Sequence, residues 1–498
     1  MLRLTWVQPE DLLGHELHQA ALDGREPGVI AARWKAAGGM EAPLRAGASP
    51  NPPSRYLRQL AKDLLDELAD LPSRLTDQEP TDLTKIKALC PSWPDASQQS
   101  CRWDDAHPSS GTHPPTQLRA VVPQGGTGGR SGTPPARASE TPQPQPPPPA
   151  AYEAAWLGRA VGCLLGKPVE KLPLQAIRQL AKSTGNWPLT TYFTARGVPE
   201  PLLRSHPWNR RSAPTSLAEN IDGMPEDDDL NYPLLNLLLL QRHTKSFTPT
   251  DVATLWLDEL PAGRTFTAER IAYRNLLLGL EPPHTARHRN PFREWVGALI
   301  RADVHGWTNP GDPAAAAEQA HRDATLTHTA NGVYAAMFTA ATIATATTGT
   351  HDIHTCLRTG LTVVPPDSRL AKAIRQAIQL AQETPDFDKV VDELHATHSP
   401  THHWVHAIPN TALIAAALTH ANGDFTASIC KAVSGGWDTD SNGATAGSIA
   451  ALVTGTPAAL PDRWTAPLKN RLATSVGDFD GTGFDALAHL THLEASRP

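Results

Sequence analysis

Helical periodicity recurs along the chain from Ala151 to its C-terminus. Apolar side chains return every three or four residues in segments such as AYEAAWLGRAVGCLLG, DVATLWLDEL and SRLAKAIRQAIQLAQE, a spacing that places them on one face of an α-helix. The alternation of apolar and polar residues that is typical of strands is scarce. The segment therefore predicts an all-α fold, with one large helical domain over residues 151–498.

Residues 1–105 predict a second, smaller helical region. The segment RYLRQLAKDLLDELADL (residues 55–71) is amphipathic, because its leucines gather on one face and its charged residues lie away from that face. PEDLLGHELHQAALDG, nearer the N-terminus, follows a similar spacing. We expect a small helical accessory region whose role the sequence does not reveal, with recruitment of a partner as one hypothesis.

Residues 106–150 connect the two helical regions and differ from both in composition. They are rich in proline, glycine, serine, threonine and glutamine, are nearly free of large apolar side chains, and end in PQPQPPPP. Such a segment cannot bury enough apolar surface to offset the entropy that is lost on ordering. We expect a disordered linker with an extended polyproline end; a proline-rich docking site is the alternative interpretation.

Charge and cysteine content argue against several classes of function. The net charge is −7 and no basic patch is apparent, so nucleic acid is not expected as a partner. The five cysteines are scattered and form no C-x-x-C pair, which argues against a disulfide framework and a zinc site. The N-terminus lacks the pattern of a secretory signal, and no apolar run is long enough to span a bilayer. We therefore expect a cytoplasmic protein without a membrane partner; its oligomeric state stays open.

An acidic cluster near the C-terminus indicates a metal site. In GGWDTDSNGATAGSIAAL (residues 435–452), Asp438, Asp440 and Ser441 offer closely spaced oxygen ligands, which suit a hard divalent cation such as Mg²⁺. The two preceding glycines allow the backbone to turn tightly, and the small residues that follow permit close helix approach. A capped helix in a crowded core is the alternative, which explains the small residues but not the two aspartates.

A second acidic cluster lies far upstream, at Glu226-Asp227-Asp228-Asp229. Adjacent carboxylates repel one another, and a metal ion is a compact counter-charge. The alternative is a solvated acidic loop that caps a helix starting near Leu230. The apolar segment PLLNLLLL that follows predicts a buried helix, which would bring its acidic start close to the core. We therefore expect the two clusters to converge on one metal site.

Four segments together resemble the signature segments of the ADP-ribosylglycohydrolases, the group related to the dinitrogenase-reductase-activating glycohydrolase. In chain order they are GRAVGCLLGKPVE (158–170), DDDLNY (227–232), HTANGVYAAMF (328–338) and GGWDTDSNGATAGS (435–448). Their order and wide spacing both match, and the resemblance spans nearly all of residues 151–498. It implies an all-α fold with a binuclear site for two Mg²⁺ ions, with Mn²⁺ as the alternative ion.

The resemblance also implies roles for individual residues. Glu170, Asp228 and Asp229 would be catalytic. The ions would be held by six residues of the two clusters: Asp227, Asp228, Asp229, Asp438, Asp440 and Ser441.

The sequence departs from the family pattern at three places. A carboxylate stands at Asp227 where the family has a threonine hydroxyl, which makes the site more negative. Trp437 is inserted between the glycines and the first aspartate of the C-terminal cluster. Cys163 stands where the family often has an aspartate.

Several residues outside the clusters are candidates for substrate binding. Asn331-Gly332 allows a turn or a close backbone approach, and Tyr334 follows it on a helical face that could receive an adenine or a ribose. Trp437 could stack on a base, and His406 could face the cleft. Core packing is the alternative for Tyr334, and shielding of the site from water is the alternative for Trp437.

The predicted function is magnesium-dependent hydrolysis of the glycosidic bond of ADP-ribose attached to a protein side chain or a small molecule. An ADP-ribosylated protein or small molecule would be the partner. One alternative is a catalytically altered module that binds ADP-ribose or another nucleotide. The other is a dimetal hydrolase that acts on another ribosyl or phosphoryl compound.

Overall fold

The computed structural model describes residues 3–42, 49, 51–94 and 146–497. The regular structure in these residues is helical, which confirms the predicted all-α fold, and backbone pairing between extended segments is limited there to two isolated bridges, Met224–Leu472 and Trp295–His406. None of the helices in the described residues has the length and apolar character needed to span a bilayer. The predicted linker, residues 106–150, lies outside the described residues as far as residue 145.

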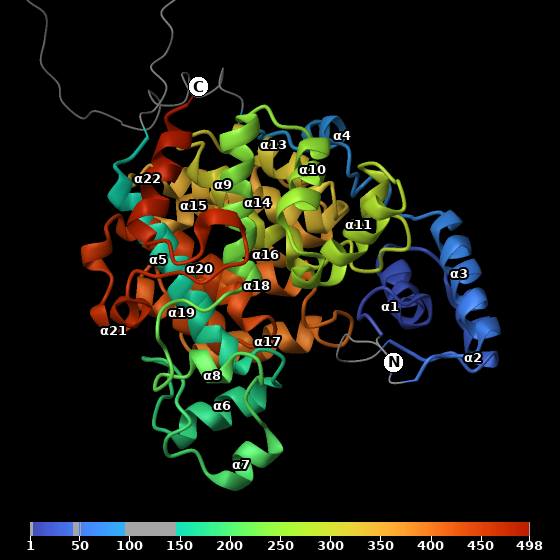
Figure 1. Ribbon diagram of the computed structural model, residues 1–498, viewed down its shortest axis with the longest axis horizontal. Coiled ribbons are helices and arrows are strands. Elements are labelled where there is room, and N and C mark those ends of the chain that lie inside the picture. The colour runs from blue at the N-terminus through green and yellow to red at the C-terminus, as the bar shows by residue number, and fades with distance from the viewer. Residues whose placement is uncertain (1–2, 43–48, 50, 95–145, 498) are drawn as a thin grey trace, which may run out of the picture.

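Two sets of helices succeed one another along the chain (Figure 1). The N-terminal set comprises α1 (Pro9–Leu22), α2 (Gly28–Ala36), α3 (Arg55–Asp70) and α4 (Leu83–Leu89). The second set comprises α5 (Pro149–Gly166), α6 (Leu174–Ser183), α7 (Glu200–Ser205), α8 (Ala213–Ser216), α9 (Asp228–His243), α10 (Pro249–Glu259), α11 (Thr267–Leu277), α12 (Asp303–Trp307), α13 (Pro313–Ala324), α14 (Ala330–Ala346), α15 (Ile353–Leu361), α16 (Arg369–Glu383), α17 (Phe387–His398), α18 (Ala407–His420), α19 (Phe425–Ser434), α20 (Thr439–Thr454), α21 (Asp462–Thr465) and α22 (Phe484–Ala495). Short 3₁₀ turns lie at Lys167–Val169, Ala262–Arg264, His284–Ala286, Val296–Arg301, Pro457–Ala459, Ala466–Leu468 and Gly477–Phe479.

Helices α5 and α20 form a closely packed antiparallel pair inside the molecule (Figure 1). A Cβ atom added to Gly158 would lie 2.3 Å from the carbonyl oxygen of Gly447, and one added to Gly162 would lie 1.9 Å from that of Gly443. Glycine at these positions lets the two backbones approach more closely than side chains would allow. The pairing brings the C-terminal end of α5 to the N-terminal end of α20.

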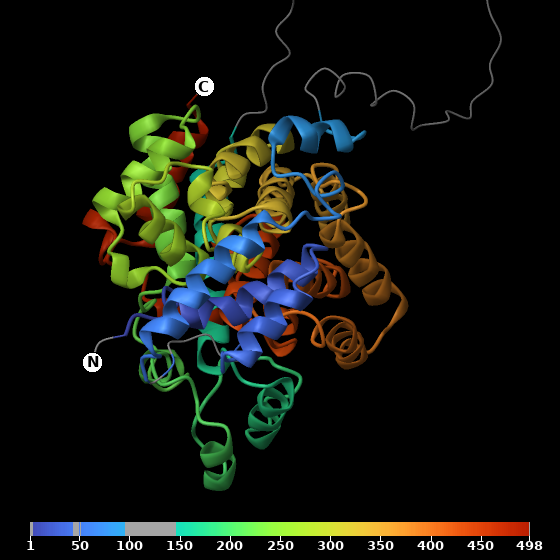
Figure 2. The ribbon, with the colours of Figure 1, turned by 90° about the vertical axis from the view of Figure 1, so that its right-hand side faces the viewer.

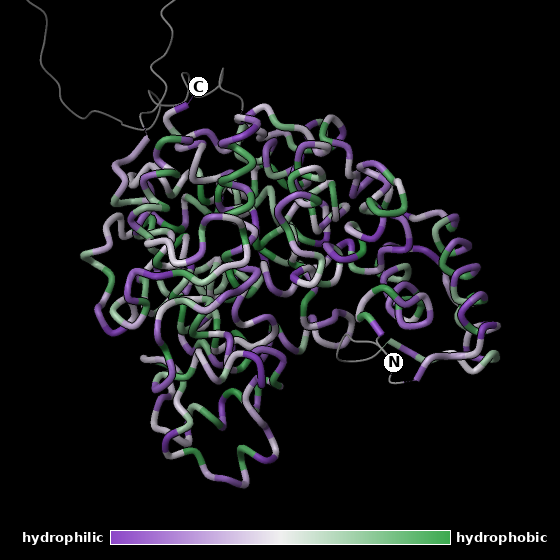
Figure 3. Tube along the Cα trace, in the orientation of Figure 1, coloured by the Kyte–Doolittle hydropathy of each residue, from purple (hydrophilic) through white to green (hydrophobic). Residues whose placement is uncertain are grey.

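The helices around this pair are buried along most of their length. Nearly every residue of α14 and α18 is buried, because small and apolar side chains occupy all of their faces. Figure 3 shows hydrophobic residues concentrated in the interior of the molecule and hydrophilic residues along its outer helices and loops. Helix α9 begins at its acidic residues and continues into the buried segment PLLNLLLL, so its start lies next to the core, in agreement with the sequence prediction.

The N-terminal helices α1 and α3 lie against this body (Figure 2). Leu64 and Leu68 of α3 share a small hydrophobic core with Ile271 of α11 and with Phe292 and Trp295. Sharing of a core removes apolar surface of both regions from water, which stabilises their association.

Buried ion pairs join the same two regions. Arg293 contacts Glu16 (Nη1 to Oε2, 2.7 Å) and Asp23 (Nη2 to Oδ2, 2.5 Å) of the N-terminal region. Arg369, at the start of α16, contacts Glu79 (Nη2 to Oε2, 2.6 Å). Because a buried charge is costly without a partner, the N-terminal carboxylates help to neutralise both cations; Arg369 also pairs with Glu294 of the main body.

Candidate active site

The C-terminal acidic cluster lies where α20 begins. Asp438 is the N-cap residue of this helix, and Asp440 and Ser441 lie in its first turn. Gly436, with a φ angle of 80°, makes the tight turn that precedes them. Asp438 and Asp440 are only 6% and 7% exposed, so water solvates their carboxylates poorly.

Glu170 joins this cluster from the end of α5. A Cβ atom on Gly166 would lie 2.2 Å from the carbonyl oxygen of Thr439, so the turn Lys167–Val169 carries the chain directly past the start of α20. One carboxylate oxygen from each of Glu170, Asp438 and Asp440 lies within 4.8 Å of the other two. The three residues therefore offer a set of oxygen ligands drawn from two distant segments.

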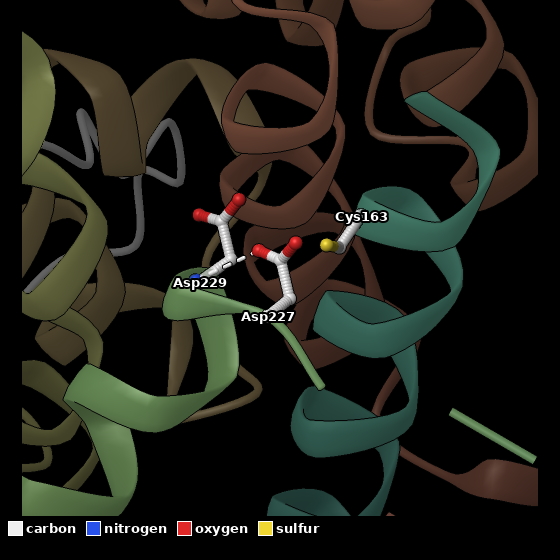
Figure 4. A group of neighbouring side chains, drawn as sticks. All are labelled: Cys163, Asp227 and Asp229. Carbon is white, nitrogen blue, oxygen red and sulfur yellow. Dashed lines mark hydrogen bonds between the residues drawn. The ribbon is translucent and has the colours of Figure 1, made fainter. Parts of the chain in front are cut away.

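The upstream acidic cluster caps α9. Asp227 is the N-cap residue, and its Oδ1 accepts a hydrogen bond of 3.0 Å from the backbone N–H of Asp229. Figure 4 shows that the carboxylate of Asp227 and the sulfur of Cys163 on α5 point toward each other. One ligand atom from each of Cys163, Asp227 and Asp229 lies within 4.8 Å of the others, which defines a second group of candidate metal ligands.

Two buried cations contact the second group. The guanidinium of Arg159 contacts Asp229 (Nη2 to Oδ1, 3.3 Å) and Asp303 (Nη1 to Oδ2, 3.0 Å), and all three side chains are buried. The ammonium of Lys167 contacts the carboxylate of Asp227. These ion pairs lower the net negative charge that remains for a metal ion at this position.

Charge repulsion also acts among the carboxylates of Glu170, Asp438 and Asp440. Burial raises the pKa of Asp438 to about 7, and the neighbouring charge of Glu170 adds to the shift. Burial also raises the pKa of Asp440, with further contributions from Glu170 and Asp438. A divalent cation would offset this repulsion, and the donor atoms are the carboxylate oxygens that Mg²⁺ prefers. The group formed by Glu170, Asp438 and Asp440 thus fits a hard metal ion.

Asp228 links the two clusters electrostatically. Burial raises its pKa, and the charges of its neighbours Asp227 and Asp229 and of Asp438 and Glu170 raise it further. Asp227 behaves in the opposite way: burial alone would raise its pKa, but the ammonium of Lys167 holds the pKa below its ordinary value.

The two clusters meet in one cavity of about 450 Å³. Carboxylates of both clusters line its floor, namely Asp227, Asp228, Asp438 and Asp440, together with Ser441 and Glu170. Asp229 does not appear in this lining and lies behind it, paired with Arg159. The structure therefore brings together all but one of the acidic residues that the sequence analysis selects. A volume of this size is typical of small-molecule sites.

The outer part of the cavity combines aromatic and basic side chains. Trp295 and Trp404 line it from the main body, and Phe266 lines it from the segment before α11. Trp6 of the N-terminal region completes this aromatic wall, with its ring 5.7 Å from that of Phe266 in an edge-to-face arrangement. Arg264 also reaches the cavity.

The candidate substrate residues Asn331, Gly332 and Tyr334 lie elsewhere, on α14. The side-chain amide of Asn331 donates hydrogen bonds of 2.8 Å to Glu79 and to Glu294. The hydroxyl of Tyr334 donates to the carbonyl oxygen of Pro80. These contacts attach the N-terminal region to the main body.

His406 and Trp437 are also separate from the cavity lining of the described residues. His406 caps α18, and its Nε2 lies 3.6 Å from Oε2 of Glu294. The ring of Trp437 stacks on that of His395 at a centroid distance of 4.2 Å. The contacts observed for these residues are with other parts of the protein. That Asn331, Gly332, Tyr334, His406 and Trp437 contact substrate therefore stays a prediction.

The cavity includes residues that the sequence analysis does not select. Lys167 belongs to the GKPVE segment, and its position three residues before Glu170 is the sequence signal that could have identified it. Asn209 donates a hydrogen bond of 2.8 Å to Oε2 of Glu170 from the loop before α8. Trp6 carries no sequence signal, because only the docking of the N-terminal region brings it to the cavity.

Comparison with known proteins assigns most of the chain to a family. The family model described as ADP-ribosylglycohydrolase matches residues 145–497. Among solved structures, 46 chains match; one, from a structure described as an ADP-ribosylglycohydrolase-related protein complex, shares 21% sequence identity with a TM-score of 0.43, and the match covers 70% of this chain and 98% of that chain. None of the curated proteins compared with the chain matches it.

Proposed function

Since this chain belongs to the ADP-ribosylglycohydrolase family and is a hydrolase of that type, we propose that it cleaves the glycosidic bond joining ADP-ribose to a protein side chain or a small molecule, in a magnesium-dependent reaction. The observation that carries the proposal is the convergence of Glu170, Asp228, Asp438 and Asp440 in one cavity.

The metal would be held by the group of Glu170, Asp438 and Asp440, which no buried cation contacts in the described residues. Asp438 and Asp440 would be its principal ligands, with Glu170 and the hydroxyl of Ser441 beside them. Mg²⁺ is the ion that we propose, with Mn²⁺ as the alternative. When bound, such an ion would lower the pKa of a nearby water and help to position the substrate.

Two carboxylates of the cavity would move the protons. Glu170 is oriented by Asn209 and by Lys171, whose Nζ lies 2.6 Å from Oε1, and it would accept the proton of the attacking water. Asp228, at the start of α9 and in the cavity lining, would donate a proton to the leaving group. The carboxylates around the ribose would stabilise the positive charge that develops at its anomeric carbon.

The outer cavity offers a complementary surface for the rest of ADP-ribose. The aromatic wall would stack on the adenine, since aromatic rings attract one another in offset or edge-to-face arrangements. Arg264 would neutralise the pyrophosphate, because a guanidinium binds phosphate oxygens through paired hydrogen bonds. This orientation would bring the scissile bond to the carboxylates of the cavity floor.

The test is release of ADP-ribose from arginine-linked, serine-linked and acetyl-linked substrates in the presence of Mg²⁺. We expect wild-type protein to release ADP-ribose from at least one of them, and the variants Asp438→Asn and Asp440→Asn to lose this activity. Asp258→Asn, an exposed carboxylate on α10, is the matched control and should retain it.

Absence of release from all three linkages would contradict the proposed reaction. Calorimetric binding of ADP-ribose without turnover would instead favour the binding-module alternative. Release of another ribosyl product, identified by mass spectrometry, would favour a different substrate class.

A further inference from the structure

The ammonium of Lys167 lies inside the acidic site. Its Nζ contacts the carboxylate of Asp227 and lies 3.5 Å from the carbonyl oxygen of Glu226. The side chains of Lys167 and Asp227 are only 7% and 9% exposed. With a carboxylate and a backbone carbonyl as its contacts, this buried ammonium is a positive charge within the cavity.

Backbone packing holds Lys167 in this position. The preceding residue, Gly166, touches the backbone of Thr439 so closely that a Cβ atom would lie 2.2 Å from its carbonyl oxygen. The following residues, Pro168 and Val169, are buried in the 3₁₀ turn. The backbone of Lys167 therefore cannot move away from the acidic site unless the end of α5 separates from α20.

Lys171, which lines the same cavity, differs from Lys167 in this respect. It pairs with Glu170 (Nζ to Oε1, 2.6 Å), but its side chain is 46% exposed. An exposed lysine can leave its carboxylate for water when a metal ion binds, at little cost. Lys167 is far less exposed, at 7%.

The two groups of candidate ligand atoms therefore differ in the charge they can still accept. Asp227 and Asp229 already face buried cations, Lys167 and Arg159 respectively. A divalent ion placed there would lie next to a buried ammonium, and like charges at short range in a poorly solvated interior repel strongly. The group around Asp438 has no such buried cation among its contacts in the described residues.

We propose that Lys167 takes the place of a second metal ion, so that the site binds one divalent ion at Glu170, Asp438 and Asp440 while the ammonium neutralises Asp227. This inference rests on the proposed function only in assuming that the cavity binds a metal. It assigns Lys167 a positioning role: it fixes Asp227, and through it the start of α9, without a second ion.

The test counts Mn²⁺ ions bound per chain, from the loss of the free-ion electron paramagnetic resonance signal during titration. Wild-type protein should bind one ion. Lys167→Ala, which removes the ammonium and leaves space beside Asp227, should bind two, and Lys167→Arg, which keeps the positive charge, should bind one. Lys171→Ala removes a lysine from the same cavity and should also bind one.

Two ions in the wild-type protein would overturn the proposal, and this result does not depend on any variant. One ion in Lys167→Ala, with a circular dichroism spectrum like that of the wild type, would overturn it too, because the lysine would then not be what excludes the second ion. No ion in the wild type would remove the premise of a metal site. ADP-ribose release is measured in a separate assay. An unexpected number of bound ions can therefore be distinguished from absence of the proposed activity.

Discussion

The buried aspartates of the site differ in what neutralises them. Asp227 faces Lys167, and Asp229 faces Arg159, which also pairs with Asp303. Burial and the neighbouring charge of Glu170 raise the pKa of both Asp438 and Asp440. The acidic clusters look alike in the sequence, but among the described residues buried cations contact Asp227 and Asp229 and none contacts Asp438 or Asp440.

This difference leads to a pH-dependent stability of the metal-free protein. The pKa of Asp438 rises from 3.8 to about 7 on folding, so the folded state binds more protons than the unfolded state between these values. The stabilising contribution is complete below about pH 4 and is lost as the pH rises toward 7. In the presence of a chelator, we expect the loss of this contribution to lower the melting temperature as the pH rises from about 4 to 7. Differential scanning fluorimetry measures this change.

Added Mg²⁺ should restore the melting temperature at about pH 8, because the ion favours the charged carboxylates. Asp438→Asn should flatten the pH dependence, while Asp258→Asn should leave it unchanged. A melting temperature that rises from pH 5 to pH 8 in the absence of metal, with the same slope in Asp438→Asn, would contradict this expectation.

At the scale of elements, the site depends on the close pairing of α5 and α20. Gly162 is the tightest point, since a Cβ atom there would lie 1.9 Å from the carbonyl oxygen of Gly443. Gly162→Ala should force the helices apart and lower the free energy of unfolding by about 1–3 kcal/mol or more. Urea denaturation measures the loss. Gly263→Ala, at a position with no atom within 4 Å of the added Cβ, is the control.

The displacement of α5 should also weaken the metal site, because Glu170 follows α5 and Asp438 precedes α20. We expect Gly162→Ala to bind Mn²⁺ more weakly than the wild type even where it remains folded. Equal stability and equal Mn²⁺ affinity in Gly162→Ala and Gly263→Ala would show that the pairing does not position the ligands.

Much at this scale follows from local sequence. Periodicity predicts the helices, as with residues 55–71, which form α3 (Arg55–Asp70). The small residues of α20 predict a close helix approach, but the partner is set by long-range packing, which periodicity does not report. The same limit applies to Lys167: its position in GKPVE is visible in the sequence, whereas its contact with Asp227 requires the tertiary fold.

At the scale of the whole molecule, the N-terminal region contributes to the cavity. Trp6 stacks edge-on against Phe266, and the cation of Arg270 lies 5.2 Å from the Trp6 ring. Trp6→Ala should raise KM for an ADP-ribosyl substrate by up to about tenfold, the equivalent of the ~0.5–1.5 kcal/mol of an aromatic contact, with kcat little changed. Steady-state kinetics test this expectation.

Trp187→Ala, a change of a partly buried tryptophan that is not in the lining of the main cavity, is the control for loss of aromatic packing. An unchanged KM in Trp6→Ala would exclude the N-terminal wall from substrate binding. A fall in kcat with unchanged KM would indicate a role in the chemical step instead.

The same docking explains why Asn331 and Tyr334 could not be placed from the sequence. An asparagine-glycine pair followed by aromatic residues is compatible with a ligand surface and with helix packing. In the fold, Asn331 contacts Glu79 and Tyr334 contacts Pro80, each more than two hundred residues away in the chain. Nothing in the local pattern around residue 331 reports a contact of that range.

The central claim is that two distant acidic clusters form one metal-binding floor. An anomalous difference map from crystals grown with Mn²⁺ tests it most directly. We expect a peak bounded by Glu170, Asp438 and Asp440, with Asp228 of the other cluster facing it across the cavity. A peak outside this cavity, or one at Asp438 and Asp440 with the start of α9 turned away, would contradict the claim.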